Sequence, residues 1–150
     1  MLCLRNTFIS TYYLGGRMQT NTKQHAGQHA KQRSLTFDKG QSLKKIKQLA
    51  YNLFEEALAQ SQNYQKALKL LLTAKQYITE ALSINPIDAD SYNLLSRIEL
   101  ELGDHQAALT AINAALGLQP DNGDYWYSSG HALLAHHETL KAKSAFQKAI

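Results

Sequence analysis

The chain has 150 residues, of which 44% are hydrophobic, and a formal net charge of +4 at pH 7. This length suffices for one domain with a hydrophobic core, and no apolar run approaches the ~18 residues that a membrane-spanning helix needs. The single cysteine, Cys3, excludes an intrachain disulfide bond and fits a reducing compartment, so we expect a cytoplasmic protein.

The basic charge is concentrated at the amino terminus, since residues 1–47 carry +8 and residues 48–150 carry −4. Residues 1–41 form a basic leader that is polar and poor in core-forming side chains after Met18, which predicts a disordered segment. The spread of the charges favours a solvated tail over a contact with nucleic acid or an anionic membrane. Residues 1–17 make a poor signal peptide. A transit peptide, or a true start at Met18, are the alternatives.

From residue 42 onward, the apolar residues recur at the three-and-four spacing of amphipathic helices. The expected helices cover about 42–60, 64–84, 89–102, 105–118, 123–136 and 139–150. The second expected helix is unusually long. Aligning its start with the repeat pattern and counting back from Pro86 place the same alanine position at Ala67 and at Ala74, seven residues apart. Seven residues are almost two helical turns, so one continuous helix with two additional turns keeps its apolar face.

Capping and turn residues separate these helices. Asn63, Asp104 and Asn122 are placed to accept hydrogen bonds from the amide groups of the helix that follows each of them. Gly103 supplies the left-handed residue that ends a helix. His137 holds the corresponding position further along the chain, and histidine tolerates this conformation less well than glycine does. That second turn is therefore either strained or differently built.

The region after Pro86 repeats itself with a period of 34 residues, the spacing between Pro86 and Pro120. The same shift pairs Tyr92 with Trp126 and small residues with small residues, as at Ser96 and Gly130, Ala108 and Ala142, and Ala115 and Ala149. A period of ~34 residues with an aromatic residue, small alanines and a closing proline is typical of the tetratricopeptide repeat.

The chain resembles the tetratricopeptide repeat family from about residue 43 to residue 150. The domain would cover 42–150, with repeats at about 48–86, 89–122 and 123–150, the first with an extended second helix and the last incomplete. The resemblance implies an all-α, right-handed α-solenoid that acts as a protein–protein interaction scaffold rather than an enzyme. Its partner would be a protein or peptide, and no cofactor or metal is expected.

The resemblance also implies which side chains line the concave groove, because the first helix of each repeat faces inward. The candidates are Asn52, Glu56, Asn93, Arg97, Leu100, Glu101, Tyr127 and His131. Arg97 is the only cation among these eight candidates, so we expect it to determine specificity for an acidic or carboxylate-bearing ligand. A chaperone-type clamp for a terminal carboxylate is not expected, because the additional basic residues it requires are missing from the set.

Histidine pairs and common catalytic motifs give no sign of chemistry. His25 and His29 are four residues apart, but Gly27 lies between them and no further ligand is placed. His136 and His137 are adjacent and would point in different directions on a helix. Neither a phosphate-binding glycine loop nor a Gly-x-Ser-x-Gly motif occurs.

Ile150 falls inside the final expected helix, before the stretch that closes the previous repeat. Solenoids normally end with a polar capping element, so we expect this chain to be the amino-terminal portion of a longer protein, or else an open end that dimerises. In the first case, the repeats could be the arm of a larger bacterial enzyme, similar to a sulfotransferase or glycosyltransferase. Reading the gene past Ile150 distinguishes these hypotheses.

Overall fold

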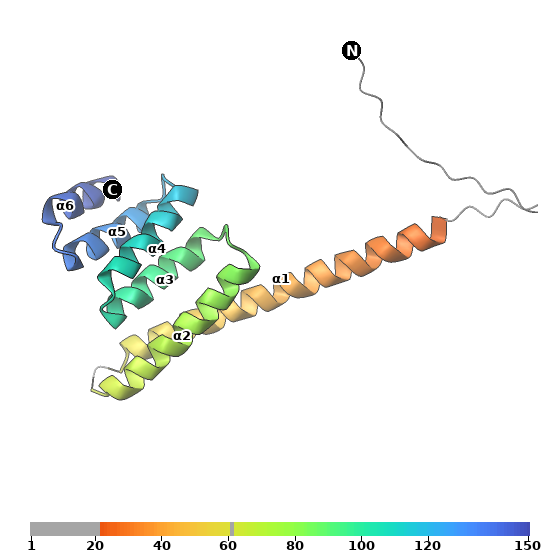
Figure 1. Ribbon diagram of the computed structural model, residues 1–150, viewed down its shortest axis with the longest axis horizontal. Helices are drawn as coiled ribbons and strands as arrows, with labels where there is room; N and C mark the ends of the chain where they lie inside the picture. The colour runs from red at the N-terminus through yellow and green to blue at the C-terminus, as the bar shows by residue number, and fades with distance from the viewer. Residues whose placement is uncertain (1–21, 61) are drawn as a thin grey trace, which may run out of the picture. The chain divides into compact units, whose positions relative to one another are not determined.

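A computed structural model describes the backbone of residues 22–60 and 62–150 and the side chains of residues 40–60 and 62–150 (Figure 1). Predictions for residues 1–21 lie outside this range. The secondary structure of the described residues is entirely helical. The six helices are α1 (Thr22–Leu58), α2 (Tyr64–Ile84), α3 (Ala89–Leu102), α4 (His105–Leu118), α5 (Gly123–Ala135) and α6 (Thr139–Lys148).

Helix α1 is longer than predicted. It begins at Thr22 rather than near residue 42, so the expectation of an unstructured chain is wrong for residues 22–41. Few of these residues are apolar, but Gln, Lys, Ala and Arg are good helix formers and no proline interrupts them. A helix nucleus in the amphipathic part of α1 can therefore extend toward the amino terminus at little cost, because propagation is much easier than nucleation.

The other helix bounds agree with the predicted ranges to within two residues. Helix α2 runs without a break from Tyr64 to Ile84, which confirms the two additional turns. The side chains of Asn63, Asp104 and Asn122 accept backbone N–H bonds from Lys66, Ala107 and Asp124, as predicted. Asp88 precedes α3 in the same position, where an aspartate cap was also expected, but its side chain forms no capping hydrogen bond.

The turns after α3 and α5 have the same construction although one contains glycine and the other histidine. Gly103 has φ +82° and His137 has φ +63°. The amide groups of Gly103 and Asp104 donate to the carbonyls of Leu100 and Glu99 at 3.0 and 2.9 Å. The amides of His137 and Glu138 donate to those of Leu134 and Leu133 at 3.0 and 2.8 Å. The turn at His137 is thus the same left-handed turn, with a residue that pays a conformational penalty there.

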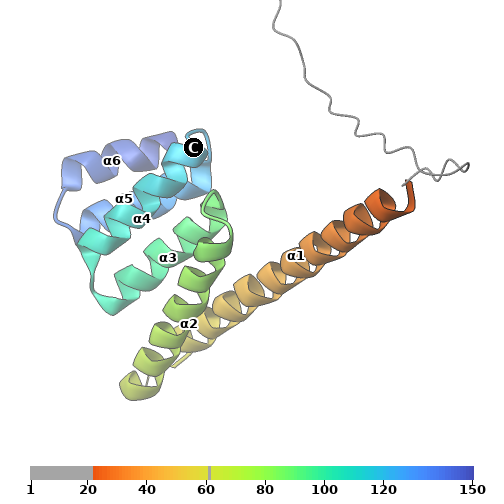
Figure 2. The same cartoon turned by 45° about the vertical axis from the view of Figure 1, so that its right-hand side comes forward.

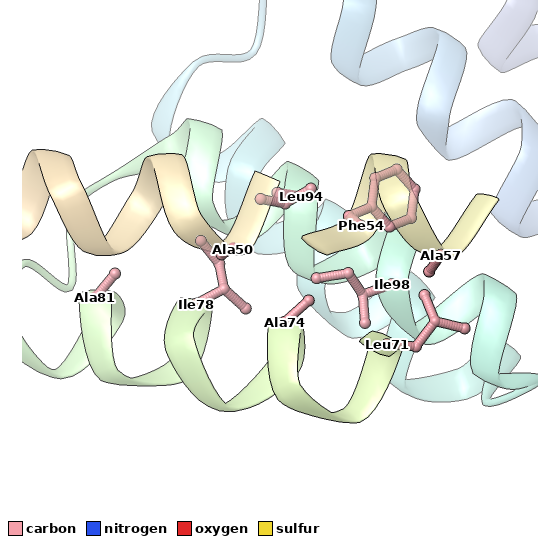
Figure 3. Close-up of a cluster of buried hydrophobic side chains, with 9 residues drawn as sticks. All are labelled: Ala50, Phe54, Ala57, Leu71, Ala74, Ile78, Ala81, Leu94 and Ile98. Atoms are coloured by element: carbon pink, nitrogen blue, oxygen red, sulfur yellow. The ribbon is translucent and has the colours of Figure 1, made fainter. Parts of the chain in front are cut away.

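A first hydrophobic core joins the carboxyl-terminal part of α1 to α2 and α3 (Figure 3). Figure 3 shows Ala50, Phe54 and Ala57 on α1, above the side of α2 that carries Ala74 and Ile78. Alanine at these contacts lets the two helices approach closely. Leu94 and Ile98 of α3 complete the same cluster.

A second core lies among α3, α4 and α5, which follow one another in Figures 1 and 2. Its largest fully buried side chain is Tyr125, which is 2% exposed and donates its hydroxyl to Asp90 Oδ1 at 2.6 Å. Burial and the neighbouring Asp90 carboxylate raise the pKa of Tyr125 well above its usual range. Tyr92 and Trp126, the aromatic residues singled out by the repeat, are only half-buried at the margin of this core.

Candidate ligand-binding groove

The six helices form the successive pairs α1–α2, α3–α4 and α5–α6. Two hollows lie side by side along α1, α3 and α5, the first helices of these pairs. The first has a volume of about 460 Å³ and lies between α1 and α3, where Lys44, Lys47 and Tyr51 form part of its lining. The second has a volume of about 450 Å³ and is lined by residues of α1, α3 and α5. Both include Asn93 and Arg97, so the two hollows adjoin there and form one groove.

Six of the eight candidate residues line the second hollow. They are Asn93, Arg97, Leu100, Glu101, Tyr127 and His131. The remaining two, Asn52 and Glu56, line neither hollow. Asn52 instead accepts a hydrogen bond from Gln48 at 2.9 Å, and Glu56 pairs with Lys66 of α2 at 3.3 Å.

The face of α1 that borders the groove carries Lys47, Tyr51, Phe54 and Leu58. These residues recur every three or four positions and therefore share one side of the helix. Asn52 lies about 100° around the helix from Tyr51, because each residue advances the helix by that angle. On α1, Asn52 thus lies one position beyond the lining residue Tyr51, and Glu56 lies two positions from both Phe54 and Leu58.

Arg97 lies at the junction of the two hollows and contacts α1. Its guanidinium carbon lies 4.6 Å from the centroid of the Phe54 ring, and Nη2 is 3.8 Å from Glu55 Oε1. The side chain remains 38% exposed. Its neighbour Asn93 has a buried Oδ1 atom without a hydrogen-bond partner within the described part of the chain. A cation and an amide group thus both lie where the two hollows adjoin.

Three aromatic rings gather at the α5 end of the groove. Tyr127 and His131 meet edge to face with centroids 4.7 Å apart, and Phe146 of α6 lies 5.7 Å from Tyr127 and 5.3 Å from His131. Mutual packing holds the rings in place, as expected for edge-to-face pairs. Tyr127 is nevertheless 56% exposed, so a large apolar surface faces the solvent.

The first hollow is basic, which the candidate residues did not suggest. Lys44 and Lys47 of α1 line it together with Arg97, and Asp90 is the one acidic residue of this lining. Lys47 is already paired with Asp88 at 2.6 Å. Two lysines outside the candidate set thus line the first hollow with Arg97.

Nothing in this geometry indicates a metal or membrane site. No group of three or more His, Cys, Asp or Glu residues in the described part of the chain is arranged to hold a metal ion. Among the described helices, none is long and apolar enough to cross a bilayer.

Helix pairs stacked in sequence, with the first helix of each pair along a common groove, define an α-solenoid of the repeat type. The family described as "Tetratricopeptide repeat" matches residues 52–123 and 93–150. The chain belongs to the tetratricopeptide repeat family. This confirms the resemblance to the family and the all-α solenoid fold. Members of the family generally act as protein-interaction scaffolds and are typically non-catalytic.

Solved structures support the fold. The chain is 23% identical to the protein of "Crystal structure of MamA", with a TM-score of 0.51, over 73% of this chain and 63% of that one. A second structure, "Crystal structure of MamA protein", is 19% identical with a TM-score of 0.51, over 74% and 62% of the two chains. The match spans less than two thirds of these neighbours, and identities this low show the fold alone. No curated protein matches the chain.

Proposed function

We propose that this chain is a protein–protein interaction scaffold that binds a peptide or a protein segment in the groove along α1, α3 and α5. The observation that carries the proposal is the pair of adjoining hollows, about 460 and 450 Å³ in volume, that share Asn93 and Arg97. Because the two hollows adjoin along three successive first helices, they can accommodate several side chains of one bound segment.

The aromatic side chains of the groove supply contact area. Tyr51 is 45% exposed in the first hollow and Tyr127 is 56% exposed in the second. Tyrosine rings lose little conformational entropy on binding, which is why they are enriched in binding hot spots. We therefore assign the apolar part of the binding energy to these two rings.

Arg97 is the residue that we assign to recognition of charge. Stacking on Phe54 and proximity to Glu55 hold its guanidinium in place, so a ligand carboxylate would meet a donor that is already oriented. Lys44 lies in the same hollow and adds a second positive charge. A ligand with an acidic side chain, or a terminal carboxylate, at the α1 end of the groove fits this arrangement.

A peptide-display selection against the wild-type chain tests the proposal. Recovered peptides are synthesised, and their dissociation constants are measured by fluorescence anisotropy on the wild type and on an Arg97→Ala, Tyr127→Ala double variant. A matched control removes the same kinds of side chain outside both hollows, as Lys143→Ala with Tyr64→Ala. Circular dichroism verifies that all three proteins are helical.

We expect the groove variant to lose at least tenfold in affinity, since a charge-assisted hydrogen bond contributes about 1.5–3 kcal/mol. The control should bind like the wild type. Equal affinity of the wild type and the groove variant for every recovered peptide would refute binding in this groove.

A further inference from the structure

Helix α3 ends with two glutamates and no basic residue in its last turn. The carboxyl end of a helix carries a partial negative charge, so each glutamate there is destabilising unless a cation compensates it. Glu99 has such a cation: its side chain is 6% exposed, and its carboxylate lies 2.8 and 3.0 Å from Lys75 Nζ of α2. The fold thus neutralises one of the two charges internally.

Glu101 is not neutralised in this way. It is exposed, lines the second hollow, and forms no ion pair within the described part of the chain. Arg97 lies one turn earlier on the same helix, but its guanidinium contacts Phe54 and Glu55 of α1. An uncompensated negative charge therefore remains at the α3 end of this hollow.

The surroundings of Glu101 suit a cation with a long aliphatic stem. Leu58 and Leu100 border the same hollow, and the rings of Tyr127 and His131 form part of its wall. Aromatic faces attract cations, most strongly where water is partly excluded. The chain shows this preference in two other places, where Arg97 lies 4.6 Å from the Phe54 centroid and Lys148 lies 4.1 Å from the Trp126 centroid.

We propose that Glu101, with the exposed Tyr127 and His131 rings, forms a subsite for a lysine or arginine side chain of the bound segment. The proposal rests on the scaffold function above and adds a direction to it. The first hollow is basic through Lys44, Lys47 and Arg97, whereas the far end of the second is acidic. A segment with an acidic side chain over α1 and a basic one near Glu101 is complementary in one orientation only, because the reverse places like charges together.

The test uses the groove-dependent peptides recovered in the display experiment. Each is resynthesised with its arginine replaced by citrulline, or its lysine by norleucine, which removes the charge and keeps the aliphatic stem of the side chain. Both forms are titrated by fluorescence anisotropy against the wild type, Glu101→Gln, and the control Glu80→Gln. Glu80 is an exposed residue of α2 that lines neither hollow.

On the wild type, loss of the peptide cation should weaken binding by about fivefold, as for a solvent-accessible ion pair at the strong end of its range. On Glu101→Gln, the difference between the two peptide forms should be clearly smaller than on the wild type, with Asp124 left as the one carboxylate of this hollow, and Glu80→Gln should behave like the wild type. The difference should shrink at high ionic strength, because salt screens exposed charges.

Two results would overturn the subsite while leaving the scaffold function intact. One is recovery of groove-dependent peptides that contain no lysine or arginine, and the other is an equal loss on the wild type and on Glu101→Gln. If no recovered peptide responds to the Arg97→Ala, Tyr127→Ala double variant, the scaffold proposal fails as well.

Discussion

The two left-handed turns allow a reciprocal test of backbone strain. We predict that His137→Gly stabilises the chain and that Gly103→Ala destabilises it. A side chain at Gly103 would meet no atom within 4 Å, so its cost is purely conformational. Placing an L-residue in the left-handed region costs roughly 1–2 kcal/mol, and removal of glycine flexibility from the unfolded chain returns about 0.4–1 kcal/mol.

The net expectation for Gly103→Ala is therefore a loss of about 1 kcal/mol in the free energy of unfolding. His137→Gly should gain about 0.5–1 kcal/mol by the same reasoning with the sign reversed, since histidine tolerates φ +63° somewhat better than alanine would. The exposed His137 side chain forms no hydrogen bond within the described residues that this change would remove.

Urea unfolding followed by circular dichroism measures both effects. The single tryptophan, Trp126, lies in the third helix pair and gives a local fluorescence probe beside it. In a repeat protein, end repeats can unfold separately from the rest, so the His137→Gly effect should be at least as large by fluorescence as by circular dichroism. A destabilised His137→Gly variant, or a stabilised Gly103→Ala variant, would refute the strain argument.

Other substitutions test the packing by the same unfolding measurements. Gly117→Ala should stabilise α4 by about 0.5–1 kcal/mol, because a methyl group there meets no atom within 4 Å and alanine favours the helix. Gly130→Ala should destabilise by about 1–3 kcal/mol, since the new methyl carbon would overlap the Phe146 ring. Trp126→Ala should cost about 2–3 kcal/mol rather than the 3–5 of full burial, because the ring is half-buried although its N–H donates to the Pro120 carbonyl at 2.7 Å. Tyr125→Phe should cost about 1.5–3 kcal/mol through the lost bond to Asp90. The raised pKa of Tyr125 means that this contribution is present below pH ~10 and lost above it, so the difference between the wild type and Tyr125→Phe should shrink as the pH rises past ~10.

The helices from α2 to α6 were predictable because their signals are local or periodic. Caps such as Asn63 and Asp104 mark helix starts within one turn, and the period of 34 residues transfers each assignment from one pair to the next. The start of α1 was not predictable in this way. Residues 22–41 lack an amphipathic pattern, and a polar sequence without a core face reads as disorder even where the intrinsic propensity favours a helix.

The burial of aromatic residues shows the limit of the periodic signal. The repeat pairs Tyr92 with Trp126, and both prove half-buried. The fully buried ring is Tyr125, which the same period pairs with Ser91, a buried residue of very different size. Because the Tyr125 hydroxyl reaches across to Asp90 of the preceding pair, its burial depends on the distance between two repeats, which no sequence period contains.

The candidate groove residues also differ in how well the sequence period places them. The candidates on α3 and α5 line the second hollow, and the period relates Asn93 to Tyr127 and Arg97 to His131. On α1 the frame is ambiguous, since the extended α2 shifts the pattern by seven residues relative to Pro86. An error of one position turns a helix by about 100°, enough to exchange a groove residue for an outward one.

The lining of the first hollow also changes how the charge asymmetry of the chain is interpreted. Lys44 and Lys47 lie within the basic first 47 residues, just after the predicted leader at 1–41. In the structure they line the first hollow beside Arg97, so part of that positive charge belongs to the groove. The excess of acidic residues after residue 47 then appears at its other end, through Glu101 and Asp124. A charge gradient along the sequence thus becomes a gradient across the groove, because successive first helices lie side by side, and this gradient is what would orient a bound segment.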